Sequence, residues 1–184
     1  EASAVDGKPF ECFTSAQTDT AAPASIVSQP TTNITELLYP EPYAIPFAAG
    51  EIVMVQFHSV NPSAAPVEPT LDLVAILADG PVKPIGEFQF YDPFVYVPAR
   101  GEGHASMRCA VPQDVDMVYM TTHQHERGVG FNVFLDPPGG PESTTPLLSA
   151  GSWEEPASKL GLTHIEAGSS FRIYCDYRDT SGVD

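Results

Sequence analysis

The sequence is poor in basic residues and has no long apolar run. Lysine and arginine together number 8 against 24 aspartates and glutamates among 184 residues, a formal net charge of −16. Such a charge repels phosphate backbones, which argues against nucleic-acid binding. No apolar run reaches the roughly 18 to 20 residues that a membrane-spanning helix needs, so we expect no membrane span. The N-terminus, Glu1-Ala-Ser-Ala, lacks the basic and apolar regions of a signal peptide.

Several motifs that carry enzyme chemistry are also absent. The sequence contains no Gly-rich phosphate loop, no Gly-x-Ser-x-Gly elbow and no Cys-x-x-Cys pair. Nucleotide binding, serine hydrolysis and thioredoxin-type chemistry therefore have no support. The many acidic residues lie mostly beside turns, where solvation explains them, and form no spaced pair typical of a general acid and base.

The cysteines do not fix the redox compartment. Cys12, Cys109 and Cys175 are an odd number, so one has no intrachain partner, and the pairing of the other two stays open. The acidic, lysine-poor composition and the sequon Asn33-Ile-Thr35 favour a secreted, periplasmic or extracellular protein.

Proline and glycine are abundant, with 19 and 14 residues. They interrupt helices and favour short strands joined by turns, so we expect an all-β protein built as an antiparallel, jelly-roll-like β-sandwich. Residues 1–45 are expected to form an irregular arm or the remnant of an N-terminal domain, and residues 46–184 the sandwich. Alternation and β-branched residues predict strands over residues 51–60, 70–77, 86–91, 94–97, 115–125, 131–135 and 170–177.

The most informative stretch is Tyr119-Met-Thr-Thr-His123-Gln-His125-Glu-Arg-Gly128. Side chains at positions i and i+2 of a strand leave on the same face, so the two imidazoles of His123 and His125 can meet at one atom. A first-row metal, copper or zinc, is the usual partner of such a pair. The alternative is that both are ordinary surface residues.

A metal site normally needs a third protein ligand. His58 closes the strand predicted over residues 51–60, where it is either a ligand or a hydrogen-bonded core histidine. His104 and His164 lie in loop-like surroundings typical of solvated surface residues. The remaining candidate donors are the thioethers of Met54, Met107, Met117 and Met120.

Four segments, taken in order, carry a family resemblance. Residues 52–61 place His58 near the end of a strand, and Cys109 precedes His123-Gln-His125 by fourteen residues. Trp153-Glu-Glu-Pro156 follows, and then residues 167–177, with Cys175 in a strand. This order resembles the copper type II, ascorbate-dependent monooxygenases, the peptidylglycine α-hydroxylating and dopamine β-monooxygenase family.

The resemblance implies two β-sandwich domains facing each other across a cleft, each with one copper. It implies that His123 and His125 ligate the oxygen-activating copper, that His58 ligates the electron-storing copper, and that the activity is O₂-dependent C–H hydroxylation with ascorbate as reductant. The family's adjacent His-His pair and its Glu-Met-Cys segment have no counterpart in this sequence. We therefore expect a fragment or subunit whose missing ligands come from a second chain or domain.

Two functions stay open from the sequence. One is a copper-binding protein similar to these monooxygenases. The other is a non-catalytic secreted β-sandwich with a structural, adhesive or assembly role, with or without metal at His123 and His125.

Overall fold

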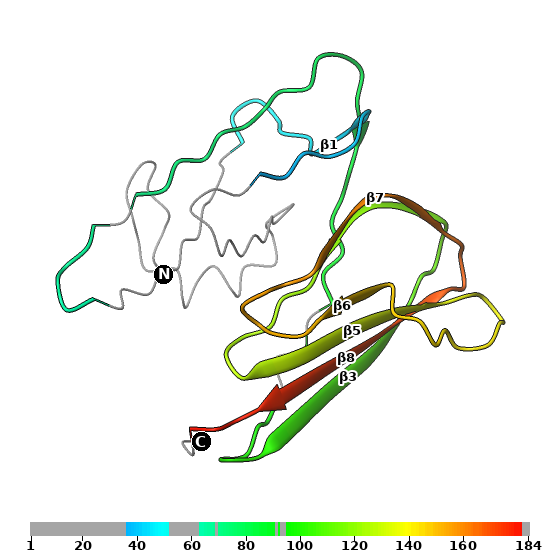
Figure 1. Ribbon diagram of the computed structural model, residues 1–184. Coiled ribbons are helices and arrows are strands. Elements are labelled where there is room, and N and C mark those ends of the chain that lie inside the picture. The colour runs from blue at the N-terminus through cyan, green and yellow to red at the C-terminus, as the bar shows by residue number, and fades with distance from the viewer. Residues whose placement is uncertain (1–35, 52–62, 69, 91, 93–94, 182–184) are drawn as a thin grey trace.

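The computed structural model describes residues 36–51, 63–68, 70–90, 92 and 95–181, and every regular element within them is a β-strand (Figure 1). The strands are β1 (Tyr43–Ala44), β2 (Lys83–Pro84), β3 (Glu102–Ala110), β4 (Val115–Thr121), β5 (Gly128–Asp136), β6 (Leu148–Ala150), β7 (Ser158–Ile165) and β8 (Ser170–Arg178). None of the described segments is a helix that could cross a bilayer.

The longer strands form two antiparallel sheets. One has four strands in the order β3-β8-β5-β6, and the other pairs β4 with β7. The short strands β1 and β2 form a separate parallel pair. The prediction of an all-β protein with antiparallel sheets is thus confirmed for the described residues.

The apolar core lies between the two sheets. Val133 of β5, together with Phe171 and Ile173 of β8, contributes from the four-stranded sheet, and Ile165 of β7 contributes from the smaller one. These four side chains are 2–6% exposed, and burying each stabilises the fold by about 1.5–3 kcal/mol. A core shared by two sheets gives the molecule its sandwich-like character.

The strand predictions hold best in the second half of the chain. The strands predicted over residues 131–135 and 170–177 correspond to β5 and β8, and the alternation of buried Phe171 and Ile173 with outward Arg172 is the reason. Strands β3, β6 and β7 were not predicted. Small and polar residues hide the pattern of β3, Gly161 interrupts that of β7, and β6 has only three residues.

Other strand predictions are wrong. Residues 70–77 and the described part of 86–91 form no strand, since β-propensity alone does not supply a hydrogen-bonding neighbour. Described residues 95–97 are likewise outside any strand. The strand predicted over residues 115–125 ends at Thr121, four residues early. The strand predicted over residues 51–60 lies, except for Glu51, outside the described residues.

The two described cysteines, Cys109 and Cys175, are both free. On the β3–β8 ladder Cys109 faces Phe171, whereas Cys175 faces Ala105. The two thiols are therefore four positions apart along the ladder, roughly 13 Å, and a disulfide needs Cα atoms within about 7 Å. This register excludes a bond between them, and Cys12 lies outside the described residues.

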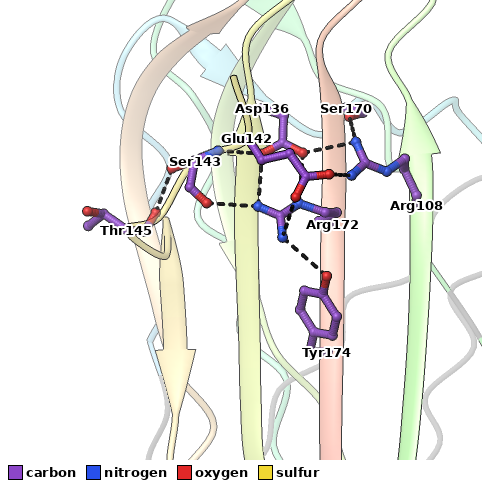
Figure 2. A network of polar contacts seen from close by, with 8 residues as sticks. All are labelled: Arg108, Asp136, Glu142, Ser143, Thr145, Ser170, Arg172 and Tyr174. Atoms are coloured by element: carbon purple, nitrogen blue, oxygen red, sulfur yellow. Dashed lines mark hydrogen bonds and ion pairs between the residues drawn. The ribbon is translucent and has the colours of Figure 1, made fainter. Parts of the chain in front are cut away.

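An ion network joins three strands of the larger sheet at one end (Figure 2). The Asp136 carboxylate of β5, only 6% exposed, accepts hydrogen bonds from Nε and Nη2 of Arg172 at 2.8 and 3.1 Å and from Nη1 of Arg108 at 3.0 Å. The backbone N–H of Ser143 donates to the same carboxylate at 2.8 Å. Glu142 accepts a further hydrogen bond from Nη2 of Arg108 and forms an ion pair with Arg172. Strands β3, β5 and β8 are thereby held in register.

The network shifts the protonation equilibria of its members. Hydrogen bonding from Arg172, with smaller help from Ser143 and from the charges of both arginines, lowers the pKa of Asp136 to about 2. The guanidinium of Arg172 also lies over the rings of Phe134 and Tyr174, 4.9 and 5.7 Å from their centroids. Asp136 therefore stays charged well below the pH at which an ordinary aspartate is protonated.

We predict that Asp136→Asn lowers the melting temperature at pH 7 by more than about 5 °C, because two guanidiniums lose the charge that compensates them. The depressed pKa means that this stabilisation is present above the unfolded value of about 3.9 and is lost as pH falls through about 2. Melting curves of wild type and variant should therefore converge between pH 4 and pH 2.

The matched control is Glu142→Gln, which neutralises a carboxylate of the same network that is 62% exposed. Its melting temperature should change by no more than about 2 °C, since exposed ion pairs contribute little. Equal losses from both variants, or a wild-type advantage that persists unchanged at pH 2, would contradict this account.

Candidate metal site

The two histidines of interest lie in the connection between β4 and β5, two and four residues beyond Thr121, the last residue of β4. Within this connection burial alternates: Thr122 and Gln124 are 3% and 4% exposed, whereas His123 and His125 are exposed. The segment thus keeps the side-chain alternation of an extended chain after β4 has ended. Both imidazoles consequently point away from the protein interior.

Thr122 fixes the first half of this segment to the residues that precede β7. Its backbone N–H donates to the carbonyl of Ala157 at 2.9 Å, and its Oγ1 accepts from the N–H of Ala157, also at 2.9 Å. This reciprocal pair continues the β4–β7 pairing by side chain as well as backbone. The position of His123 is therefore set by the smaller sheet.

Gln124 fixes the second half to the larger sheet. Its Nε2 donates to the carbonyl of Gly130 at 2.9 Å, with a longer contact to the carbonyl of Asp176 at 3.5 Å. The chain then turns through Arg127, whose φ is 79°, and the N–H of Gly128 donates to the carbonyl of His125 at 3.1 Å. The histidine segment thus bridges the two sheets.

The imidazole rings of His123 and His125 lie side by side, with centroids 5.0 Å apart and planes inclined at 80°. Protein packed around the His123 ring removes part of its hydration although the side chain remains exposed. This desolvation, with a smaller contribution from the neighbouring His125, lowers the pKa of His123 below 6.5. The prediction that alternation brings the two rings together agrees with this geometry.

The other candidate ligands are placed differently. His104 lies in β3 and His164 in β7, so the expectation of loop-like surroundings is wrong for both, although both side chains are exposed. Nδ1 of His104 lies 2.7 Å from Asp176, and Nδ1 of His164 lies 2.8 Å from Asp116. Hydrogen bonding to Asp116 raises the pKa of His164. Three of the candidate thioethers, those of Met107, Met117 and Met120, pack against the apolar core.

The third ligand is not supplied by the described part of the chain. No group of three or more His, Cys, Asp or Glu side chains suited to a metal ion occurs among the residues that the structure describes. His58 and Met54 lie outside those residues. Among the described residues, the imidazoles of His123 and His125 are the two histidine rings that lie beside each other.

A shallow hollow of about 310 Å³ begins at the residue after His125. Glu126, Arg127 and Trp153 line it together with residues 178–181. Trp153, the single tryptophan of the sequence, is held at this hollow because its backbone N–H donates to the carbonyl of Gly128 at 3.1 Å. The histidine segment thus borders an aromatic surface with charges of both signs.

Sequence reasoning missed Thr122 and Gln124, the two residues that hold the segment. A polar residue beside a histidine is expected to face solvent until its partners are known. Ala157 and Asp176 lie far along the chain, and Gly130 is reached only after the chain turns into β5. The alternation that predicts solvent-facing side chains at His123 and His125 also predicts that Thr122 and Gln124 face the protein interior, and this pattern is the signal in the sequence that could have identified them.

Comparisons with protein-family models, with curated proteins and with solved structures found no match.

We predict that His123 titrates below 6.5 when followed by NMR of its ring protons. In a His125→Ala variant its pKa should rise only part of the way toward 6.5, because desolvation is the larger cause of the shift. A His123 pKa at or above 6.5 in the unsubstituted protein would show that the ring is more hydrated than its packing indicates.

Proposed function

We propose that this protein binds Cu(II) through His123 and His125. The observation that carries the proposal is the 5.0 Å separation of the two ring centroids on the exposed side of the segment that bridges the sheets. No other pair of described histidines has this relationship, because His104 and His164 are each engaged with an aspartate.

The ring separation suits a shared ion. A metal–nitrogen bond to imidazole is about 2.0–2.1 Å, and the ring centre lies roughly 1.1 Å beyond the bound nitrogen. Two imidazoles bound at angles of roughly 90–110° therefore have centres roughly 4.5–5.2 Å apart. The observed 5.0 Å lies inside that interval, so the spacing of the two rings is compatible with one shared ion.

The chemistry of the donors favours copper among the available divalent ions. Imidazole nitrogen suits Cu(II), which also binds most strongly in the first-row series at a given nitrogen site. The net charge of −16 adds a general attraction for cations. His123 and His125 would hold the ion, and water or a donor from another chain or domain would complete its coordination.

We further propose that the bound copper serves a reaction like that of the ascorbate-dependent monooxygenases, which the sequence resembles. Copper supplies one-electron redox chemistry to enzymes of that family. The order of the four resembling segments supports a fragment or subunit of an ascorbate-dependent hydroxylase, exported from the cell, with a jelly-roll connection of the strands and with His58 as ligand of a second copper. In that enzyme the described part of this chain would contribute His123 and His125, which lie just beyond the end of β4.

We predict that the protein takes up one equivalent of Cu(II) with His123 and His125 as ligands, because among the described histidines only these two have rings close enough to share an ion. In a calorimetric titration a His123→Ala/His125→Ala variant should lose this event. It should also lose the rise in melting temperature that binding to the folded chain produces.

The matched control is His104→Ala/His164→Ala, which removes the same number of exposed imidazoles and should leave the binding event intact. Equal Cu(II) uptake by the wild type and the His123→Ala/His125→Ala variant would remove the proposal.

A second function, assembly without catalysis, is favoured by a different observation. Residues 70–78 belong to no helix or strand, and no backbone hydrogen bond joins them to another described residue. Their apolar side chains lie in water: Val74 is 80% and Leu77 85% exposed. Exposed apolar segments with unpaired backbone mark association sites, and a second copy of the chain can pair the same segment about a twofold axis.

Under this second function the protein should associate as its concentration rises, which sedimentation velocity would measure. Val74→Glu/Leu77→Glu should stay monomeric, whereas the control Leu162→Glu, at an exposed leucine of β7, should associate like wild type. A wild-type protein that stays monomeric throughout the concentration series contradicts self-assembly.

A further inference from the structure

Gln124 is a buried amide between two exposed imidazoles. Its residue is 4% exposed, whereas its neighbours His123 and His125 are both on the surface. Burying an amide without a hydrogen bond is unfavourable, so the position of such a side chain is set by its partners. Those partners therefore also set where the two histidines emerge.

The partners of Gln124 belong to two neighbouring strands. The Nε2 donor reaches the carbonyl of Gly130 in β5 at 2.9 Å and lies 3.5 Å from the carbonyl of Asp176 in β8. Gly130 and Asp176 face each other in register, at the point where the β5–β8 pairing shifts between Gly128 and Gly130. An irregularity in the ladder leaves carbonyl groups for a side chain to use, and Gln124 occupies this place.

Gly128 closes the site from the other side. A Cβ atom at this position would lie 2.9 Å from Cβ, Cδ and Oε1 of Gln124, closer than real Cβ contacts allow. Part of this contact is with the Cβ of Gln124, which cannot move without the backbone. The glutamine is thus confined between its carbonyl partners and the backbone of Gly128.

We propose that Gln124 is the positioning residue of the His123/His125 pair. By anchoring the segment to the carbonyls of Gly130 and Asp176, it keeps both imidazoles on the same side, near enough to share one ion. The inference rests on the proposed copper binding. Residues that orient metal ligands without touching the metal typically change affinity 10–100-fold when they are replaced.

The experiment compares the Cu(II) complexes of wild type, Gln124→Met and Gly128→Ala. Methionine keeps a similar volume and removes the amide donor, whereas alanine at position 128 pushes on an unchanged Gln124. The control is Gln113→Met, at an exposed glutamine in the β3–β4 connection. Pulsed EPR counts the imidazoles bound to one equivalent of Cu(II), and a competition titration gives the dissociation constant.

Wild type and Gln113→Met should show two bound imidazoles. Gln124→Met and Gly128→Ala should show one, with affinity lowered about tenfold or more. If both variants keep two imidazoles and an affinity within about twofold of wild type, Gln124 serves stability alone and the inference is wrong. If wild type itself shows no bound imidazole, the proposed copper function has failed, which is a distinguishable result.

Discussion

The candidate metal site depends on one constraint, the alternation of buried and exposed side chains along residues 122–125. Thr122 is hydrogen-bonded to Ala157 beside the smaller sheet, and Gln124 is hydrogen-bonded to carbonyls of the larger one. Because the buried side chains of Thr122 and Gln124 are fixed by these hydrogen bonds, the side chains of His123 and His125 must point to the opposite side, toward solvent. The side-by-side rings of His123 and His125 follow from this bridging, not from any contact that the rings make.

The same strands that receive Gln124 are held rigidly at their other ends. Strand β5 begins at Gly128, beside the histidine segment, and ends at Asp136, the centre of the ion network, roughly 25 Å away along an extended chain. Strand β8 runs in the opposite direction between the same two places, with Arg172 near its start and Asp176 near its end. The buried carboxylate thus stabilises the pair of strands on which the candidate metal site is built.

The sequence predicts the direction of the two histidine side chains, but not the contacts that hold their segment in place. Spacing alone places His123 and His125 on one side, because alternation is a local property of extended backbone. The end of β4 at Thr121, the role of Gln124 and the pairing of Asp136 with Arg172 depend on residues brought together by strand register, which no local pattern encodes. Residues 70–77 show the opposite case, in which a local pattern predicts a strand that does not form. These residues have no partner strand among the described residues.

The most direct measurement is a crystal structure of the copper-soaked protein with anomalous data collected at the copper absorption edge. The account predicts one anomalous peak between the two rings, about 2.0–2.1 Å from a nitrogen of His123 and of His125. A peak that contacts one ring alone, a peak at His104 or His164 instead, or no peak on the protein would contradict it.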